Sequence, residues 1–422
     1  MEILATGEKI KRARIYKGLT LKDICGDKLS ISKLSCIEND KIKAEPEILQ
    51  YISKKLDIDY DYLTESTKTQ LERNLKMLKS KKSIEGYEDA LKYNLDFSLK
   101  NNYYDLAFEF IHILFSYYLE GREVNKILDI TSTYYHICYK SGENEHYFLY
   151  YCDMGKYLFS YKEYDQAIIY YNMAKNILEN NNYKDDIRLA EVLYFEILCY
   201  VFMKKFNCID KLTFQLETLV GQIEDNEFAG KIYHLLAGVF IFINEDKFME
   251  YEKKTYELYN DNPEKMGKAK LDFAFSMLHM NLRDKAIEYI REGLELCSRC
   301  DEAIRVNYII GTIGALMEYD LYDLYDLAEE LCDEALNYAI QSGNVKYIDR
   351  AYYYKAIFLE KRAKYEDAEM YMNLSLDALL KYGGKSEKVN KYMDIANMYY
   401  KLGAVKDALK YLTLAMKFED PL

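Results

Sequence analysis

Near the N-terminus, five side chains that can contact DNA bases gather at the start of one predicted helix: Ser30, Ile31, Ser32, Lys33 and Ser35. A lysine can reach the O6 and N7 atoms of guanine, and a serine hydroxyl can bond a base or a phosphate. Basic residues around this helix would contact the DNA backbone. They are Arg12, Lys17, Lys22, Lys41 and Lys43. The pattern favours binding of double-stranded DNA over the alternative that these are solvated surface charges.

Residue sets typical of catalysis or metal binding do not occur in the sequence. Cys297 and Cys300 form a single CxxC pair with no second pair nearby, so a four-thiolate zinc site is not implied. The five histidines lack metal-ligand spacing, and no phosphate-binding or dinucleotide-binding glycine motif is present. We therefore expect no enzymatic activity, no metal and no cofactor.

The charge of the chain is unevenly distributed. Residues 1–82 hold 18 basic and 13 acidic side chains, whereas the remainder holds 39 basic and 57 acidic ones. The net charge is therefore +5 at the N-terminal end and −18 in the rest. This asymmetry predicts that only the N-terminal part meets a polyanion.

Local sequence signals predict five short helices in the N-terminal part. Gly18 ends the first helix, Thr20 with Asp23 caps the second, Ser30 caps the third, and Pro46 begins the fourth. The expected bounds are residues 7–17, 21–25, 31–39, 46–56 and 57–63. Two helices joined by a tight turn within residues 20–39 match the geometry that lays a recognition helix in the major groove.

This segment resembles the lambda-repressor-like (XRE-type) helix-turn-helix domains through "GEKIKRARIYKGLTLKDI" and "SISKLSCIEND". The resemblance implies a structural ion pair between Arg14 and Glu38 that orients the recognition helix. The turn before that helix is one residue shorter than usual. Leu21 stands where the family often has a phosphate-holding Gln, so we expect backbone amides or Lys22 to make that contact.

A basic segment with Leu71, Leu75 and Leu78 at helical spacing follows and predicts a connecting helix. The expected organisation is a helix-turn-helix domain at 1–64, a helical linker at 65–83 and a repeat domain at 84–422.

The repeat domain is predicted from small residues that recur with steps of twelve and seven. The four sets are Gly155/Ala167/Ala174, Ala274/Ala286/Gly293, Ala356/Ala368/Ser375 and Ala396/Ala408/Ala415. Small residues let neighbouring helices approach to about 8–9 Å. The anchor positions repeat every 40 or 41 residues, which adds Phe115, Glu196, Ala237 and Ala315 to the series. We expect seven or eight helix pairs.

The strings "YKEYDQAIIYYNMAK", "AKYEDAEMYMNLSL" and "GAVKDALKYLTLAM" resemble the second helix of tetratricopeptide (TPR) repeats. The predicted fold is therefore all-α: a lambda-repressor-like helix-turn-helix bundle followed by a right-handed TPR-like solenoid. Such arrays form a concave trough for an extended peptide or a partner helix.

The combination of a DNA-reading domain, a short helical join and TPR-like units is similar to the RRNPP group of peptide-responsive transcription regulators. This resemblance implies a homodimer on a palindromic operator. It also implies a short signalling peptide in the trough that alters DNA affinity, as in quorum sensing.

In that group, polar side chains on the first helix of each repeat hold the peptide backbone. Counting from the small residues places these side chains near that face: Lys231, His234, Lys268, Asp272, Arg350, Tyr353, Asn390 and Asn397. Asn390 and Asn397 are preferred, because an amide both donates to and accepts from an extended backbone.

Two alternatives stay open: an adaptor whose trough recruits a protein partner without a peptide, and an enzyme-modulating TPR protein. The first twenty residues lack the apolar core of a secretion signal, and the nine cysteines are scattered as in reduced proteins. We expect a cytoplasmic protein without a membrane partner.

Overall fold

The structure, a computed structural model of the 422-residue chain, describes residues 2–26, 28–81, 85–180, 185–318 and 325–419. Over these residues every regular element is a helix, with 23 α-helices and one short 3-10 helix. The all-α prediction is confirmed. The chain divides into two compact units, Met1–Ile209 and Asp210–Leu422.

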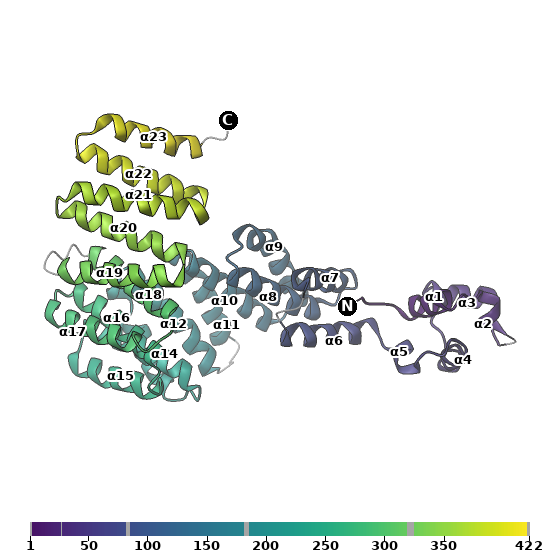
Figure 1. The fold of residues 1–422 in the computed structure, drawn as a ribbon. Helices are drawn as coiled ribbons and strands as arrows, with labels where there is room; N and C mark the ends of the chain where they lie inside the picture. Colours follow the sequence, from purple (N-terminus) through teal and green to yellow (C-terminus); the bar gives the residue numbers. More distant parts are fainter. Residues whose placement is uncertain (1, 27, 82–84, 181–184, 319–324, 420–422) are drawn as a thin grey trace. The chain divides into compact units, whose positions relative to one another are not determined.

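The first unit begins with five short helices around a small apolar core (Figure 1). They are α1 (Thr6–Tyr16), α2 (Leu21–Cys25), α3 (Ile31–Glu38), α4 (Pro46–Leu56) and α5 (Tyr60–Thr64). Gly18 ends α1 with a φ of 67°, a conformation that suits glycine. Thr20 and Ser30 cap α2 and α3 by accepting hydrogen bonds from the backbone N–H groups of Asp23 and Lys33.

The predicted connecting helix is present as α6 (Thr67–Ser80). Leu71 and Leu78 are fully buried, and Leu75 is partly buried against the same core. The predicted boundary between residues 83 and 84 lies outside the described residues.

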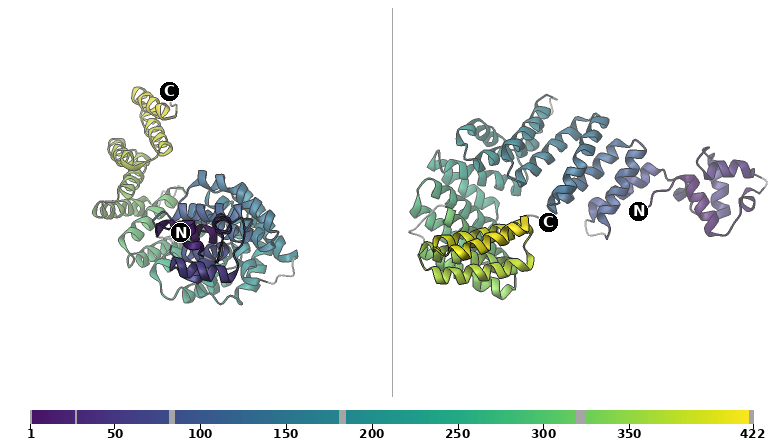
Figure 2. Two further views of the ribbon diagram at one scale, coloured as in Figure 1. Left: turned by 90° about the vertical axis from the view of Figure 1, so that its right-hand side faces the viewer. Right: turned by 90° about the horizontal axis from the view of Figure 1, so that it is seen from above.

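Antiparallel helix pairs make up the rest of both units (Figures 1 and 2). The first unit continues with α7 (Tyr87–Lys100), α8 (Tyr104–Glu120), α9 (Val124–Ser141), α10 (Asn144–Ser160), α11 (Tyr164–Asn180), α12 (Asp186–Phe202) and the 3-10 helix η1 (Phe206–Cys208). The second unit contains α13 (Asp210–Val220), α14 (Asn226–Phe240), α15 (Glu245–Leu258), α16 (Pro263–His279), α17 (Arg283–Cys297), α18 (Glu302–Glu318), α19 (Tyr325–Ser342), α20 (Val345–Lys361), α21 (Tyr365–Tyr382), α22 (Lys385–Lys401) and α23 (Val405–Glu419). We call the even-numbered helices from α8 to α22 A helices, and the helix that follows each of them within the same unit its B helix.

All twelve small residues of the four predicted sets are buried. At Gly155 an added Cβ would lie 2.5 Å from a ring carbon of Tyr171, so a larger residue could not occupy this position. The predicted role of small residues at the helix contacts is therefore confirmed.

Two extrapolated anchor positions are wrong. The buried anchors Gly155, Ala274, Ala356 and Ala396 are each the twelfth residue of their A helix. The twelfth residues of α12 and α18 are Ile197 and Ile313, both fully buried, and not Glu196 and Ala315. The reason is that both the B helices and the connections between helix pairs differ in length, so a constant step loses the register; α17, for example, has 15 residues and α21 has 18.

In the described part of the chain, five of the connections between the two helices of a pair are three-residue turns. The middle residue of each of these five turns has a positive φ. These residues are Arg122, Lys162, Asn281, Ala363 and Gly403. The left-handed residue lets the chain reverse within three positions.

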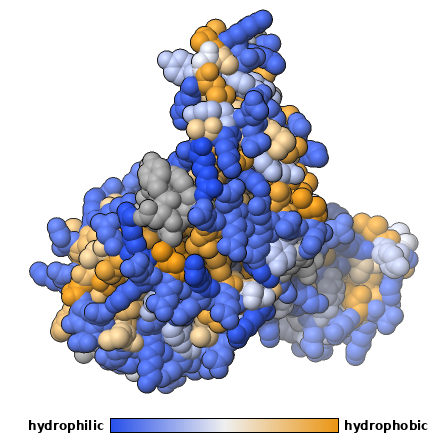
Figure 3. Space-filling model, turned by 60° about the vertical axis from the view of Figure 1, so that its left-hand side comes forward, coloured by the Kyte–Doolittle hydropathy of each residue, from blue (hydrophilic) through white to orange (hydrophobic). Residues whose placement is uncertain are grey.

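The face shown in Figure 3 is mainly hydrophilic, with smaller apolar patches between the charged side chains. Among the described helices, none combines the length and the hydropathy needed to cross a bilayer.

Candidate functional site

The first turn and a half of α3 carries the five residues predicted to face a DNA groove. Ser30, Ile31 and Ser32 are exposed, and Lys33 and Ser35 are partly exposed. The opposite side of α3 is buried through Leu34 and Ile37. The amphipathic pattern of this short helix therefore leaves its N-terminal residues free to meet a ligand.

The other end of α3 is fixed by an ion pair that the sequence predicted. Arg14 Nε donates to Glu38 Oε1 at 2.7 Å and Arg14 Nη2 donates to Glu38 Oε2 at 2.8 Å. A third guanidinium hydrogen bond reaches the carbonyl of Leu19 at 3.1 Å. The bond to Glu38 raises the pKa of Arg14, against the effect of burial. This two-pronged contact holds α3 in one orientation relative to α1.

The start of α2 is already occupied by a carboxylate. Asp23 Oδ2 accepts hydrogen bonds from the backbone N–H of Thr20 at 2.7 Å and from its hydroxyl at 2.6 Å. These bonds lower the pKa of Asp23. Because a negative charge sits here, exposed Lys22 is the better α2 candidate for a phosphate contact.

Three of the other predicted backbone contacts, Lys17, Lys41 and Lys43, are exposed, and Lys17 and the predicted base contact Lys33 each lie in a charge pair. Lys41 and Lys43 are exposed in the segment after α3. The Lys17 ammonium is 3.5 Å from Asp57, and the Lys33 ammonium is 3.8 Å from Glu45. Such exposed pairs are weak and can open for a phosphate.

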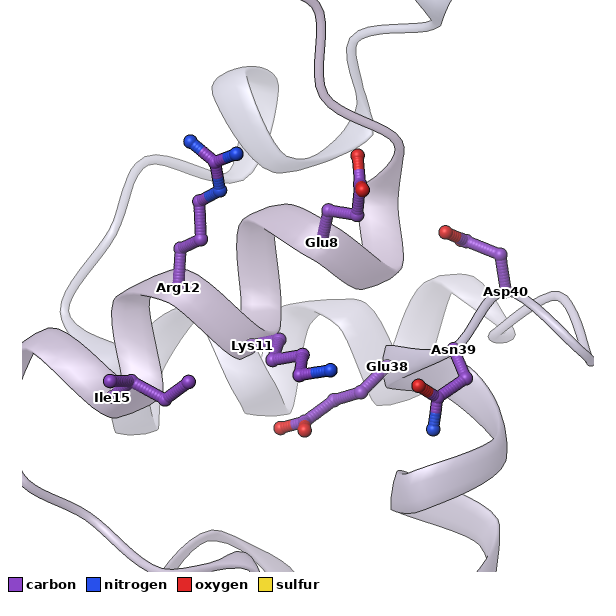
Figure 4. A pocket seen from close by; sticks show the side chains of 7 residues that line it. All are labelled: Glu8, Lys11, Arg12, Ile15, Glu38, Asn39 and Asp40. Carbon is purple, nitrogen blue, oxygen red and sulfur yellow. The ribbon is translucent and has the colours of Figure 1, made fainter.

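Arg12 lies away from the start of α3. It lines a pocket of about 400 Å³ between α1 and the C-terminal end of α3 (Figure 4). The pocket residues are Glu8, Lys11, Arg12, Ile15, Glu38, Asn39 and Asp40. Both guanidinium nitrogens of Arg12 donate to Glu2, at 2.5 and 2.6 Å. A phosphate contact by Arg12 therefore requires this pair to open.

Residues that the sequence analysis missed join the helix-turn-helix bundle to α6. Buried Lys9 donates from Nζ to the carbonyls of Tyr62 and Glu65, at 2.6 and 2.8 Å. Gln70 exchanges two hydrogen bonds with the backbone of Leu4, at 3.1 and 2.9 Å. Ile3 is buried against the apolar core that contains Leu71 and Leu78. These contacts span up to 66 residues, and no local pattern predicts them.

The predicted peptide-binding residues lie on four A helices of the second unit: α14, α16, α20 and α22. Lys231, Lys268, Arg350, Asn390 and Asn397 are exposed. Lys231 forms an ion pair of 2.9 Å with Glu227 on its own helix. Asn390 and Asn397 are seven residues apart on α22, which places them on the same side of that helix.

The remaining three candidates belong to polar pairs that repeat along the A helices. In each pair the ninth residue of one A helix meets the tenth residue of the next. His112 Nδ1 lies 2.7 Å from Asp153 Oδ2, His234 Nε2 lies 3.4 Å from Asp272 Oδ2, and the Tyr353 hydroxyl donates to Asp394 Oδ2 at 3.1 Å. We call these contacts the register pairs.

The register pairs differ in their protonation. Burial lowers the pKa of His234 to about 3, with a further contribution from Lys268, so this imidazole is neutral. Burial raises the pKa of Asp272 to about 6, and Lys268 opposes this rise. For His112, burial lowers the pKa, but the hydrogen bond and charge of Asp153 outweigh burial, and the net pKa is raised.

A buried ionic cluster lies beside the candidate residues of α22. Lys391 Nζ donates to Ser375 Oγ at 2.7 Å and to Asp349 Oδ1 at 3.1 Å. Tyr382 donates to the other oxygen of Asp349 at 2.6 Å. The Lys391 ammonium also lies 3.9 Å from the ring centroid of Tyr353. The cluster ties α20, α21 and α22 together, and sequence periodicity does not reveal it.

Within the described part of the chain, no group of His, Cys, Asp and Glu side chains could hold a metal ion. Burial raises the pKa of Cys297 to about 12 and also raises the pKa of Cys300. Both thiols are therefore poor nucleophiles at neutral pH.

No model of a known protein family matches the sequence. A search of curated proteins also found no match. Among solved structures, the chain is similar to the apo form of RapI, with 14% identity, coverage of 83% of this chain and 97% of that chain, and a TM-score of 0.47. It is also similar to the apo form of the quorum sensor NprR from B. thuringiensis, with 15% identity, coverage of 86% and 100%, and a TM-score of 0.45.

A third similar structure is PlcR from Bacillus thuringiensis in complex with the peptide PapR7 and DNA. The identity is 13%, the coverage is 95% of this chain and 98% of that chain, and the TM-score is 0.31. At these TM-scores, none of the three likenesses assigns a function to this chain.

Proposed function

We propose that the chain is a DNA-binding transcription regulator whose helical repeats bind a short signalling peptide and thereby gate operator binding. The observation that carries the DNA-binding half is the exposed first turn of α3, held at its far end by Arg14 and Glu38. A helix exposed at its N-terminal turn and anchored behind can insert that turn into the major groove.

The peptide-binding half is supported by the exposed amides of Asn390 and Asn397 and by the exposed cations Lys268 and Arg350 on A helices of the second unit. Together these groups can bond a peptide backbone and its carboxylate.

We further propose that the regulator acts in the cytoplasm as a homodimer on a palindromic operator. Two recognition helices must then sit about 34 Å apart to read successive major grooves. A peptide that prefers one dimer geometry would shift this spacing, typically with about 1–3 kcal/mol of coupling.

The DNA-binding proposal is tested by selecting bound sequences from random duplex DNA with the full chain. Affinity for the selected duplex should fall steeply between about 50 and 200 mM salt, because phosphate contacts release counterions. Lys33→Ala and Ile31→Ala should weaken this binding about tenfold, while Lys54→Ala on α4 should leave it unchanged. Equal affinity in all three variants would refute a role for α3.

The gating proposal is tested by measuring operator affinity and dimer mass with and without saturating peptide. If affinity does not change for any peptide that binds, gating is wrong. A stable protein partner that co-purifies without any peptide would favour the adaptor alternative.

A further inference from the structure

Of the three register pairs, only His234–Asp272 leaves its carboxylate half open. Asp153 lies against both His112 and the Tyr134 hydroxyl, at 2.7 and 2.8 Å, and its side chain is 9% exposed. Asp272 has the 3.4 Å contact with His234, and its side chain is 47% exposed. The carboxylate at the tenth position of the A helix is therefore covered by other side chains of the protein in α10 and accessible in α16.

Charge compensation at Asp272 is also incomplete. His234 is neutral, so it offers no countercharge. Lys268 stands four residues earlier on α16, and among the described residues it forms no ion pair with Asp272 within 4.0 Å. Above a pH of about 6 the half-exposed Asp272 carboxylate is ionised. Such a group gains free energy when a cation arrives.

The neighbouring A helices leave room for a ligand beside this carboxylate. Helix α16 packs against both α14 and α18. Gly311 is the tenth residue of α18, which is the position that Asp272 occupies on α16. Gly238 follows His234 by one turn on α14. An added Cβ at either glycine would meet no atom within 4 Å. Helices α14 and α18 are therefore not covered by other side chains at these two glycines.

The rest of the molecule agrees with a cationic ligand. The chain beyond residue 82 carries 57 acidic and 39 basic side chains, and its net negative charge attracts cations over a distance. The exposed Asp272 carboxylate gives this general attraction a specific end point.

We propose that Asp272 is the subsite for a cationic group of the bound peptide, an ammonium or a guanidinium, which enters between Gly238 and Gly311. The inference rests on the proposed peptide binding and names the side-chain class that the trough selects. In the complex the cation forms a charge-assisted hydrogen bond with Asp272, and His234 holds the carboxylate from the other side.

The experiment uses two pools of synthetic heptapeptides, acetylated at the N-terminus and amidated at the C-terminus. One pool contains lysine at a scanned position, and the other contains acetyl-lysine there, so the pools differ only in charge. The full chain is immobilised, and the retained peptides are quantified by mass spectrometry. Wild-type protein should retain the lysine pool about tenfold better.

Two variants distinguish the outcomes. Asp272→Asn should abolish the preference for lysine, whereas Asp377→Asn, at an exposed position of the B helix α21, should keep it. Circular dichroism melting checks that both variants are folded. If Asp272→Asn keeps the preference, or Asp377→Asn loses it equally, the subsite assignment is overturned while peptide binding stands. If neither pool is retained by wild-type protein, the proposed peptide binding fails, and the subsite fails with it.

Discussion

The ammonium nitrogen of Lys9 lies 2.8 Å from the carbonyl oxygen of Glu65, in the short connection between α5 and α6. The amide of Gln70 donates to the same carbonyl at 3.2 Å from α6. The connection is thus bonded by a residue of α1 and by a residue of α6. The helix-turn-helix bundle and α6 are therefore joined by fixed hydrogen bonds and not by a loose tether.

Replacing Lys9 with methionine keeps the length of the side chain and removes its donors. The carbonyls of Tyr62 and Glu65 then lose a buried partner, which should lower the free energy of unfolding by about 1–3 kcal/mol. Urea unfolding measures this change, and limited proteolysis should cut faster around Glu65. Lys11→Met, on the exposed side of α1, is the control. Equal unfolding curves for both variants would contradict the role of Lys9.

Removing one partner of the Arg14–Glu38 pair should be costly. Arg14→Ala leaves the Glu38 carboxylate, which is 4% exposed, without its countercharge. Breaking a buried pair in this way typically costs about 3–5 kcal/mol. Thermal unfolding measures the loss, and Arg12→Ala should leave stability unchanged, because Arg12 and Glu2 are both more than half exposed. Similar melting temperatures for the two variants would argue against an anchoring role.

The His112–Asp153 pair should make stability depend on pH. The pKa of His112 is raised in the folded state, so its protonated form is stabilised by folding. This contribution is fully present below the unfolded pKa of about 6.5 and is lost as pH rises through the folded value. Other groups titrate as well, including His146, whose pKa is lowered by burial.

The contribution of His112 is isolated by comparing the wild type with His112→Gln in urea at pH 5.5 to 8.5. The stability difference between the two proteins should shrink as pH rises. A difference that is constant over this range would show that the charge of His112 does not matter.

The recurring three-residue turn predicts two substitutions of opposite sign. Ala363 holds a φ of 57°, and Gly403 holds a φ of 76° at the same place in the next pair. Ala363→Gly should stabilise by about 1 kcal/mol because it relieves left-handed strain, and Gly403→Ala should destabilise by a similar amount. Gly403 has open space around it, so only backbone strain is tested there. Shifts of the same sign in the two melting temperatures would refute this account.

Features encoded by neighbouring residues could be predicted from the sequence, whereas most contacts between residues far apart in the chain could not. The caps Thr20 and Ser30 and the start at Pro46 are encoded within a few residues, and the helix bounds follow them closely. The buried small residues were predictable because helix contacts repeat with a regular step. By contrast, buried Lys9 and Lys391 have partners up to 56 and 42 residues away, and spacing alone does not separate them from surface lysines.

The candidate ligand residues were predicted less completely for the same reason. The exposure of Asn390 and Asn397 follows from helical periodicity. The contacts of His234 with Asp272 and of Tyr353 with Asp394 depend on the register between consecutive A helices. That register changes with the length of each connection between pairs, which the sequence repeats do not specify.

The connections between helices also decide where the stack can be modified. Connections from a B helix to the next A helix vary from two residues at 383–384 to four at 259–262. Within the pairs, five connections keep the three-residue turn, and the connection between α14 and α15 has four residues, 241–244. Length variation is therefore greater at the edge where one pair joins the next. Fluorophores or epitope inserts for measuring distances between repeats belong at this edge, for example at Arg299, which is exposed between α17 and α18.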